Sequence, residues 1–543
     1  MFIRSIFLSF NSIFLNLNQL IRRIYLNSPV YNNKISKISN KELIYRPSQS
    51  IFNCLIKFDK KKDNIDDFSL NSIWKNSIKL KIKNLKKLHS FFWLFTLDLR
   101  SSQKTTQNVI YNWIEQNEKY EKNIWDLDIL SKRIIAWISN SKLTYENSET
   151  NYKLHFDILI KKQTNHLINE INRSQKFDDK IIGSTAIILV GLTYNDTYYL
   201  KFGIDLLKQL LKLSLDSSNF PKSRNLRQLV FYLKYLIVIR ELLKESHTDI
   251  PEFLEEAIFY LGKAYNLLCA NKKTGFLFNG NFEDTNKEFD NYLNFRKYKF
   301  KDDTNETGGY IVLKNKKSLL VFDAGKAPDK KFSRDYQAGL LSFEFNFLGE
   351  KVITNSGYFQ DYKHQLNIIS KSTATHSTLV LDNTSCVRFE RHKNGNMFVS
   401  KQFKILEKEI KSEKNYWYIK ASHDAYLKPY GVIHERQLSY FHDNNKLKGC
   451  DKLIKVKKFK SCGFAIRFHL LPQINLTKLL NKESILIESK NAGWKFTCKN
   501  HKIDIETGLY FGMKNKFLEN KNIIITGLTN PDEQNIFWEI SKI

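Results

Sequence analysis

The hydrophobic period of the chain changes once, near residue 271, and this change constrains the fold more than any other feature. Between about residues 70 and 270, apolar residues recur at helical spacing, with few Gly or Pro to interrupt them. From Tyr310 onward, short runs of alternating apolar and polar residues are separated by turns. Helices followed by strands predict two segregated domains, a helical bundle or toroid and then an antiparallel β-sandwich.

The same patterns predict the individual elements. Helices are expected over residues 73–96, 106–117, 130–139, 153–173, 180–191, 198–215, 226–242 and 253–268. Strands are expected over residues 310–314, 318–324, 340–347, 351–356, 377–382, 417–422, 437–443, 464–470, 484–489, 494–499, 502–506, 509–513, 522–528 and 536–540. The polar, turn-rich stretch between residues 272 and 307 is expected to be a linker or a long loop.

One stretch of the second half combines a strand pattern with many polar and aromatic residues. Three phenylalanines of residues 343–347 alternate with polar residues, as in a strand with one face on a core. Gly349 then turns the chain into a second strand, which predicts a hairpin. Polar residues 335–337 and 355–358 lie at the ends of this hairpin. We expect them to meet residues 373–378 (TATHST) at one rim of the sheet and to form a functional site there.

Length and charge bound the possible partners. The chain has 543 residues, too many for one ordinary core, and a formal net charge of +30. A surface this positive concentrates polyanions, so acidic polysaccharide, nucleic acid and anionic membrane all qualify as partners. The sequence is also rich in Lys, Asn and Ile, as AT-rich coding gives, so compositional drift explains the charge equally well. Because the Lys residues are dispersed rather than gathered with aromatic residues, we do not expect nucleic acid as the partner.

Cysteine spacing and hydropathy exclude further classes of protein. The six cysteines are scattered, with no Cys-x-x-Cys pair and no His cluster at zinc-finger spacing. Neither a disulfide framework nor a structural zinc module is therefore expected. No segment offers about 20 uninterrupted apolar residues, so no integral membrane span is expected. The apolar run of residues 5–17, between Arg4 and Arg22, fits either a signal peptide or an amphipathic first helix.

Three segments of the second half resemble the heparinase II/III-like family of polysaccharide lyases, in its bacterial branch. They are AGLLSFEF (338–345), NSGY (355–358) and KSTATHSTLV (371–380), with looser similarity at residues 88–94, 223–242, 276–284, 323–325 and 421–438. The resemblance implies an incomplete α/α toroid followed by a β-sandwich. The implied domains are an N-terminal segment packing on the helical domain (1–69), the toroid (70–285), a linker or loop (286–307) and the sandwich (308–543).

Lyases of this family cleave uronic-acid-containing glycans by β-elimination, in a cleft between the two domains. The resemblance therefore implies an acidic polysaccharide substrate and a carbon–oxygen lyase activity, and it leaves the oligomeric state open. A catalytically degenerate glycan-binding or cell-envelope polysaccharide assembly protein is the alternative. Family members commonly work in the periplasm or cell envelope, and a cytoplasmic location is the other option because the signal peptide is not clear.

The metal ligands of the family are replaced in this chain. The family's His-x-His pair falls on Asp335 and Gln337. Members that carry zinc hold it with the second of these histidines, an Asp and a further His, which correspond here to Gln337, Asn355 and His376. Two amides and one imidazole bind zinc poorly, because the ion prefers charged or strongly basic ligands. We therefore predict no metal and no other cofactor.

The resemblance, together with residue chemistry, nominates the site residues. The catalytic candidates are His376, Tyr336 and Tyr358, because a His or Tyr can remove the weakly acidic C5 proton or protonate the leaving oxygen. The phenols are expected to ionise more easily beside positive charge. Substrate contacts are expected from Arg224, Asn225, Lys371 and Asn279, and supporting contacts from His423, Asn355 and Gln337.

Several of these candidates also have a purely structural interpretation. A lone His such as His376 is more often structural than functional. Asn225 fits the N-cap of the helix that follows it, and Asn279 fits a turn. Tyr232, in the helix predicted over residues 226–242, is expected to be a core residue rather than a catalytic base.

Overall fold

The computed structural model describes residues 17–56, 74, 82–97, 102–270, 272–301, 303–392, 395–456, 460–489, 492–530 and 532–543. The predicted N-terminal helix or signal peptide falls almost entirely outside these residues. Contacts within the chain divide it into two compact units. The first unit comprises Met1–Leu213 and Tyr232–Ile258, and the second comprises Ser214–Phe231 and Phe259–Ile543.

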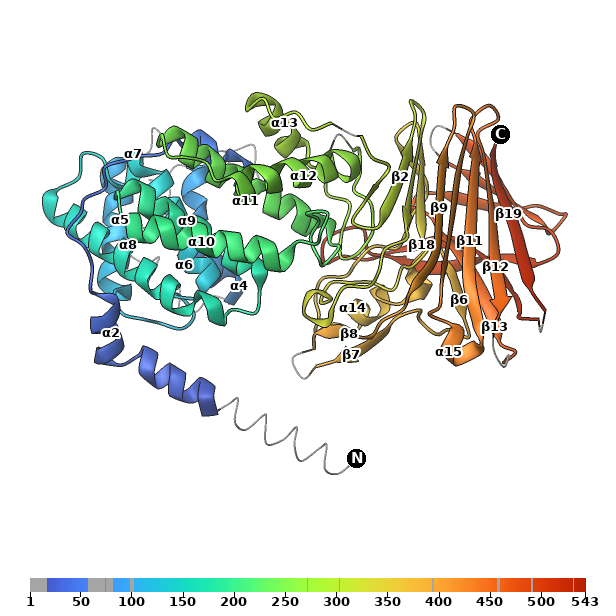
Figure 1. Cartoon of the computed structure of the whole chain (residues 1–543), viewed down its shortest axis with the longest axis horizontal. Coiled ribbons are helices and arrows are strands. Elements are labelled where there is room, and N and C mark those ends of the chain that lie inside the picture. The colour runs from blue at the N-terminus through green and yellow to red at the C-terminus, as the bar shows by residue number, and fades with distance from the viewer. Residues whose placement is uncertain are drawn as a thin grey trace. The chain divides into compact units, whose positions relative to one another are not determined.

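The first unit is helical (Figure 1). Its α-helices and 3-10 helices (η) are α2 (Pro29–Ile35), η1 (Gln49–Leu55), α4 (Ile82–His89), η4 (Phe92–Thr96), α5 (Gln103–Asn117), α6 (Leu127–Ser139), α7 (Ser141–Thr144), α8 (Thr150–Glu170), η5 (Ile171–Arg173), α9 (Phe177–Thr193) and α10 (Thr197–Ser214). Two more, α11 (Leu226–Glu245) and α12 (Glu252–Leu268), are divided between the units. Helix α9 is buried along residues 181–193, because its sequence is apolar on almost every face. The seven helices predicted after residue 100 are confirmed to within a few residues at each end.

The helix predicted over residues 73–96 is wrong in its second half. Helix α4 ends at His89, and Phe91 has a φ of 54°, in the left-handed region. A separate 3-10 helix, η4, follows it. The Phe91 ring is fully buried and packs edge-on against Trp113 and Trp137, with centroids 5.8 Å and 5.2 Å away. Tertiary packing of this ring overrides the helical periodicity. Residues 73 and 75–81 lie outside the described part of the chain.

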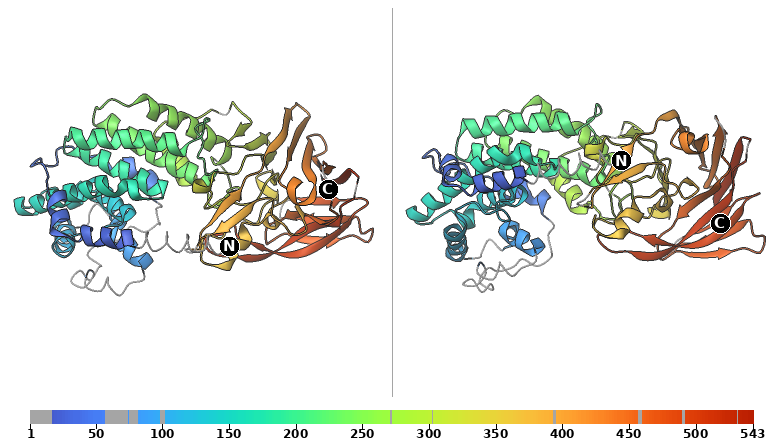
Figure 2. Two further views of the ribbon diagram at one scale, coloured as in Figure 1. Left: turned by 60° about the horizontal axis from the view of Figure 1, so that its bottom comes forward. Right: turned by 90° about the horizontal axis from the view of Figure 1, so that it is seen from below.

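The second unit is built from antiparallel sheets (Figure 2). The five-stranded sheet has β1 (Glu306–Thr307), β2 (Tyr310–Lys314), β3 (Ser318–Asp323), β4 (Phe343–Phe347) and β5 (Glu350–Ile353) in sequence order. The eight-stranded sheet has the order β14 (Asn475–Lys478), β15 (Ser484–Glu488), β16 (Gly493–Thr497), β19 (Gln534–Lys542), β12 (Lys446–Lys455), β11 (Val432–Phe441), β10 (Tyr416–His423) and β9 (Ile405–Ser412). The smaller sheets are β17 (Lys502–Tyr510), β18 (Leu518–Leu528), β13 (Gly463–His469) and β6 (Leu379–Leu381), and β7 (Arg388–Arg391) with β8 (Met397–Lys401).

One aromatic cluster joins the three larger sheets. Phe343 of β4 stacks on Trp538 of β19, with ring centroids 5.7 Å apart. Phe468 of β13 packs edge-on against the same Trp538 at 4.7 Å. Because each ring comes from a different sheet, this cluster connects the three sheets within the sandwich core.

The predicted hairpin is confirmed. Strands β4 and β5 pair through Phe347 and Glu350, and the two residues between them, Leu348 and Gly349, have φ of 51° and 78°. Positive φ at both positions is the geometry of the two-residue turn that suits the twist of a hairpin, and Gly adopts it at no steric cost.

Three other expectations need correction. Residues 502–506 and 509–513 were predicted as two strands, but one strand, β17, runs from Lys502 to Tyr510 and ends before residues 511–513. The stretch expected to be a linker contains the helix α13 (Lys287–Phe295). Strands β7, β8, β9, β12 and β14 were not expected. In β12 the inward positions include Gly449, which lies under the Trp538 ring, and the charged Asp451, so the apolar alternation is lost. The remaining helical segments of this unit are η6 (Lys330–Phe332), α14 (Gln365–Ser370), η7 (Thr373–Thr375) and α15 (Leu427–Tyr430).

Asp451 forms a buried ion pair with Arg436, its cross-strand partner on β11. Arg436 Nε and Nη2 donate to the two Asp451 oxygens at 2.8 Å and 2.9 Å. The Trp538 indole N–H and His434 Nε2 contact the same carboxylate at 3.0 Å and 2.7 Å. The remaining Arg436 nitrogen, Nη1, donates to the carbonyls of Leu341 and Ser377, at 3.0 Å and 2.7 Å. Every polar atom of this pair is therefore used within the fold, as a buried charge requires.

The Asp451→Asn variant tests the contribution of this pair to stability. The substitution leaves the Arg436 charge buried without its counter-ion, so we expect a loss of about 3–5 kcal/mol of folding free energy. Thermal unfolding followed by tryptophan fluorescence measures the effect. Glu409→Gln on the exposed strand β9, whose carboxylate pairs with Lys411, is the matched control and should not change the melting temperature. Equal melting temperatures for wild type and Asp451→Asn would contradict the assignment.

Candidate functional site

The segments that flank the β4–β5 hairpin meet at one rim, as the sequence predicts. The Ser356 N–H donates to the Thr375 carbonyl at 3.0 Å, and the Ala338 N–H donates to the Lys371 carbonyl at 2.9 Å. The Ser377 N–H donates to Asn355 Oδ1 at 2.9 Å. Backbone and side-chain hydrogen bonds thus hold residues 335–338, 355–358 and 371–378 together.

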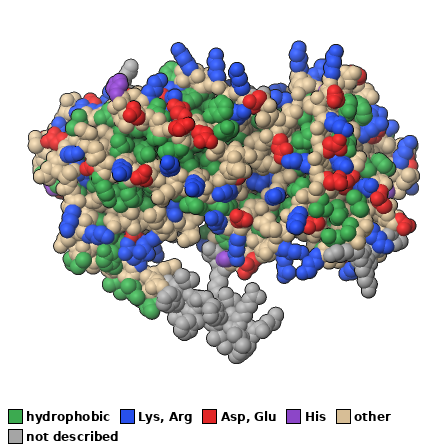
Figure 3. All heavy atoms as spheres, in the orientation of Figure 1, with side chains coloured by type: hydrophobic (Ala, Val, Ile, Leu, Met, Phe, Trp, Pro, Cys, Tyr) green, Lys and Arg blue, Asp and Glu red, His purple; other side chains and the backbone are tan. Residues whose placement is uncertain are grey.

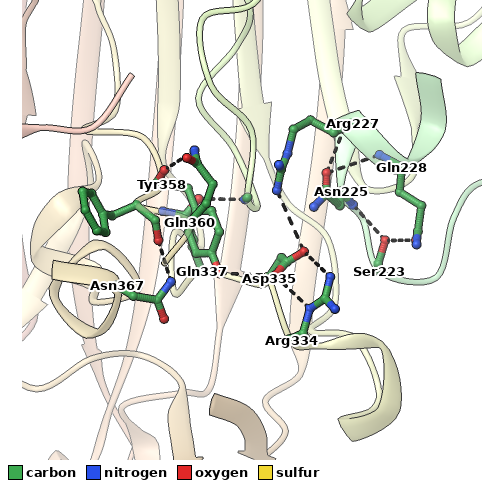
Figure 4. A network of polar contacts seen from close by, with 12 residues as sticks. Ser223, Asn225, Arg227, Gln228, Arg334, Asp335, Gln337, Tyr358, Gln360 and Asn367 are labelled. Atoms are coloured by element: carbon green, nitrogen blue, oxygen red, sulfur yellow. Dashed lines mark hydrogen bonds and ion pairs between the residues drawn. The ribbon is translucent and has the colours of Figure 1, made fainter. Parts of the chain in front are cut away.

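The carboxylate of Asp335 is the centre of the polar network at this rim (Figure 4). Arg334 donates to it through Nε and Nη2, at 3.2 Å and 3.1 Å. The Tyr358 hydroxyl donates to Oδ1 at 3.2 Å, and Arg227 Nη2 lies 3.9 Å from Oδ2. The side chains of Arg334, Arg227 and Asp335 are 43%, 32% and 23% exposed. Two cationic groups therefore remain accessible beside one carboxylate.

The charges around Asp335 determine its protonation. Burial alone would raise the pKa of this carboxyl, but Arg334, Arg227 and Lys371 together hold it well below its ordinary value. Asp335 is therefore ionised at any physiological pH.

The first turn of α11 positions Arg227. Asn225 Oδ1 accepts from the N–H groups of Arg227 and Gln228 at 2.8 Å and 3.4 Å, which is the hydrogen bonding of an N-cap. Ser223 Oγ accepts from the Asn225 N–H and donates to Gln228 Oε1. The Arg227 guanidinium lies 5.1 Å from the centre of the Phe282 ring. The predicted substrate contact Asn225 is buried, and its side-chain oxygen serves as the helix cap.

Arg224, predicted to grip substrate, is directed into the protein. Its φ is 57°, in the left-handed region. Its Nη2 pairs with Asp323 Oδ1 at 2.7 Å, and its Nε donates to the Gly308 carbonyl at 2.8 Å. The guanidinium carbon lies 4.5 Å from the centre of the Tyr310 ring. These protein groups occupy the donors of Arg224, whereas Arg227, three residues later, is the partly exposed arginine of this segment.

Asn279 links the Arg224 cluster to the rim. Its Nδ2 donates to the Tyr310 hydroxyl at 2.5 Å and to Asp323 Oδ2 at 3.3 Å, and its Oδ1 accepts from the Gln337 N–H at 3.3 Å. Its φ of 43° fits the turn that the sequence also allowed. The side chain is buried, so its contacts are to protein groups.

The residues that correspond to the family's zinc ligands do not fit a zinc ion. The Gln337 oxygen accepts from the Gly280 N–H at 2.9 Å, and its Nε2 donates to the carbonyls of Gly357 and Ser370. The Asn355 oxygen accepts from the Ser377 N–H. Both amide oxygens therefore already accept a hydrogen bond, and neutral amide oxygens are weak zinc ligands, so the His376 imidazole is the one strong donor of the three. In the described part of the chain, no group of three or more His, Cys, Asp or Glu residues is arranged to hold a metal ion.

His376 is buried and neutral. Its Nδ1 lies 2.9 Å from the Ser372 carbonyl, so Nδ1 carries the proton and donates. Its Nε2 is buried and, among the described residues, has no hydrogen-bond partner. The ring packs so closely on Gly339 that a Cβ there would lie 2.4 Å from Cδ2. Burial lowers the pKa of His376 to about 4. The unprotonated Nε2 can accept a proton only from a donor that reaches this buried position.

The two tyrosine candidates are neutral phenols. Burial, followed by the charge of Asp323, raises the pKa of Tyr336 well above its ordinary value. Burial, followed by the charge of Asp335, likewise raises the pKa of Tyr358. The expectation that positive charge would ease their ionisation is therefore wrong, because burial outweighs the arginines. Tyr336 lies in the sandwich core, whereas the Tyr358 hydroxyl faces the Asp335 network.

Lys371 and His423 are buried, and their contacts are to protein groups that support the rim. The buried Lys371 ammonium donates to the carbonyls of Arg334 and Met397, and burial lowers its pKa to about 8. His423 accepts from the Ala425 N–H, and its Nε2 lies 3.2 Å from His434 Nδ1. His434 in turn contacts Asp451, the partner of Arg436. His423 is thus connected, through His434 and Asp451, to Arg436, which donates to the Leu341 and Ser377 carbonyls.

Sequence reasoning missed Arg227 and Arg334 as members of the site. It placed Asp335 at the rim, in the position of a family histidine, but gave its side chain no role. Two signals were available: Arg334 and Asp335 form an adjacent pair of opposite charge, and Arg227 follows a helix-capping Asn by two residues. Neither signal shows by itself that the three side chains converge.

Comparison with protein families and solved structures agrees with this architecture. Residues 303–539 match the family model described as heparinase II/III-like, C-terminal. A sequence search against curated proteins finds no significant match. Among the described residues, no helix is both long and apolar enough to cross a membrane.

Several solved structures share the fold. A heparinase III with methylated lysines aligns with a TM-score of 0.68 at 12% identity, over 85% of this chain and 78% of that chain. A heparan sulfate lyase from Pedobacter heparinus gives 0.64 at 12% identity, over 91% and 82%. A further heparinase III gives 0.65 at 13% identity, over 94% and 88%. The predicted fold class, an incomplete α/α toroid followed by an antiparallel β-sandwich, is confirmed by these matches.

The buried state of His376 predicts a pH effect on stability. Its folded pKa lies below the unfolded value of about 6.5, so the unfolded chain binds more protons between about pH 6.5 and pH 4. The contribution of His376 is fully favourable above this window and is lost as the pH falls through it. In the His376→Asn variant the amide N–H replaces the Nδ1–H hydrogen bond but does not titrate. Between pH 6.5 and pH 4 we therefore expect this variant to lose roughly 3 kcal/mol less folding free energy than wild type.

Urea unfolding at several pH values between 4 and 7 measures this difference. His364→Asn is the matched control, because His364 is exposed and Asn can also accept the N-cap hydrogen bond of α14. Identical pH dependence in wild type and His376→Asn would contradict the neutral, buried assignment.

Proposed function

We propose that the protein cleaves an acidic, uronic-acid-containing glycan by β-elimination. Its residues 303–539 belong to the heparinase II/III-like C-terminal family. The observation that carries the proposal is the pair of accessible arginines, Arg227 and Arg334, beside the Tyr358 hydroxyl and the Asp335 carboxylate. Forked guanidinium donors match the geometry of carboxylate and sulfate groups.

The requirements of β-elimination support this proposal. A base removes the proton on C5, the C4–O bond breaks, a C4=C5 double bond forms, and the leaving oxygen takes up a proton. Negative charge grows on the C5 carboxylate during proton removal. Arg227 and Arg334 supply fixed positive charge for that carboxylate, which lowers the barrier.

Tyr358 and His376 are the proton carriers in this proposal. Tyr358 is a neutral phenol at the rim and can donate its proton to the leaving oxygen, and Arg227 and Arg334 offset part of the burial that disfavours the phenolate. His376 has an unprotonated Nε2 at neutral pH and is the candidate base. Lys371 does not touch substrate in this proposal. It positions Arg334 by donating a hydrogen bond to the backbone carbonyl of Arg334.

The net charge of the protein attracts polyanions of any kind and is therefore less selective for a ligand than the arginines of the rim. Figure 3 shows Lys and Arg side chains spread over the visible face, with Asp and Glu among them. A dispersed net charge of +30 speeds encounter with any polyanion. Selection of an acidic glycan therefore depends on the arginines of the rim.

A second candidate function is glycan binding without cleavage. Two observations favour glycan binding. His376 Nε2 is buried, and Gln337, in place of the second family histidine, donates to the backbone carbonyls of Gly357 and Ser370. The protein would then retain acidic glycans as a catalytically degenerate member of the family, for example in cell-envelope polysaccharide assembly.

An ultraviolet assay for unsaturated products separates the two functions. Wild type incubated with heparan sulfate or a non-sulfated uronic-acid polymer should produce absorbance from the new double bond. Tyr358→Phe should lower kcat by roughly a hundredfold or more, because the proton donor is lost. The exposed Tyr362 provides the control Tyr362→Phe, which should leave kcat unchanged.

Arg334→Gln should raise KM and lower kcat, whereas Arg388→Gln, on the exposed strand β7, should do neither. Retention of glycan on an affinity column without any absorbance change would contradict the lyase and support the binding protein. No retention and no absorbance would contradict both functions.

A further inference from the structure

The geometry points to Asp335 as a built-in competitor for the anionic group of the ligand, so that this residue determines how much negative charge a ligand must carry to bind. The inference rests on the proposed binding of an acidic glycan at this rim. Asp335 would then be a specificity-determining residue rather than a proton carrier.

Asp335 occupies the donors that a ligand oxyanion needs. Arg334 contacts both of its oxygens in a forked arrangement, at 3.2 Å and 3.1 Å, and Tyr358 adds a third hydrogen bond. Carboxylate and sulfate groups bind arginine in the same forked way. A ligand that takes the forked Nε and Nη2 edge of Arg334, or the hydrogen bond of the Tyr358 hydroxyl, must displace the Asp335 side chain.

Arg227 is the part of the cluster that Asp335 does not satisfy. Its Nη2 lies 3.9 Å from the nearest Asp335 oxygen, beyond hydrogen-bond distance. Its Nε is buried and has no hydrogen-bond partner among the described residues. A buried donor without a partner is unfavourable, so an oxyanion that reaches it gains stabilisation. We therefore expect a ligand to engage Arg227 first and to compete with Asp335 for Arg334.

The competition favours ligands with several anionic groups. Asp335 is attached to the chain next to Arg334, so its effective concentration at the guanidinium is high. Its charge also repels an incoming anion at short range. A single free carboxylate should bind weakly for both reasons. A chain with repeated carboxylate and sulfate groups can contact Arg227 and Arg334 together and displace Asp335.

The Asp335→Asn variant removes the competing charge and keeps the shape of the side chain. Calorimetric titration at low ionic strength, with inorganic sulfate and sodium glucuronate as separate probes, should show Kd values lower by about tenfold or more than in wild type. Asp329→Asn is the matched control, because Asp329 is exposed and makes no capping hydrogen bond on η6. It should leave both Kd values unchanged.

A variant carrying Arg227→Gln, Arg334→Gln and Asp335→Asn together identifies the donors. The gain in affinity should disappear in it if the two arginines bind the anion. Circular dichroism and the melting temperature establish that each variant is folded, and Asp335→Ser replaces Asp335→Asn if the latter does not fold.

The inference is overturned if folded Asp335→Asn binds sulfate with unchanged or lower affinity, because Asp335 would then only orient the arginines. This outcome differs from failure of the proposed function. If no glycan is cleaved or retained but sulfate binds more tightly to Asp335→Asn, the proposed function is wrong and the role of Asp335 as a competitor at an anion site stands.

Discussion

The candidate site depends on the buried ion pair between Arg436 and Asp451. Asp451 accepts from Arg436, and the Trp538 indole and His434 contact the same carboxylate, so one carboxylate joins strands β11, β12 and β19. The last Arg436 nitrogen donates to the carbonyl of Ser377, in the rim segment 371–378, and to that of Leu341, three residues after the rim segment 335–338. A charge buried this deeply remains in place only when all of its partners are in place. The same atoms that stabilise the sandwich therefore fix the position of the rim.

Burial divides the groups of the rim into two classes. His376 is enclosed against Gly339 and stays neutral because burial lowers its pKa. Asp335 remains ionised because the arginines outweigh its burial. The buried groups Gln337, Lys371 and His376 make their hydrogen bonds to the backbone, whereas the partly exposed arginines can exchange their partner for a ligand.

Sequence periodicity predicted most helices and the β4–β5 hairpin, because their apolar faces and turn residues are local signals. It failed where distant residues decide the backbone. Phe91 breaks a helix to pack against Trp113, and β12 places Gly449 and Asp451 at inward positions. The meeting of three segments at one rim was predicted, but the side chains that converge there were predicted less completely. The sequence shows an arginine at the start of α11 but not that Arg224 turns inward to Asp323 while Arg227 faces Asp335.

A crystal structure of the protein with a sulfated uronic-acid oligosaccharide tests the central claim most directly. The account predicts a carboxylate or sulfate group within hydrogen-bond distance of both Arg227 and Arg334, with Asp335 displaced from its forked contact. An oligosaccharide bound away from this rim, with the Arg334–Asp335 contact intact, would contradict it.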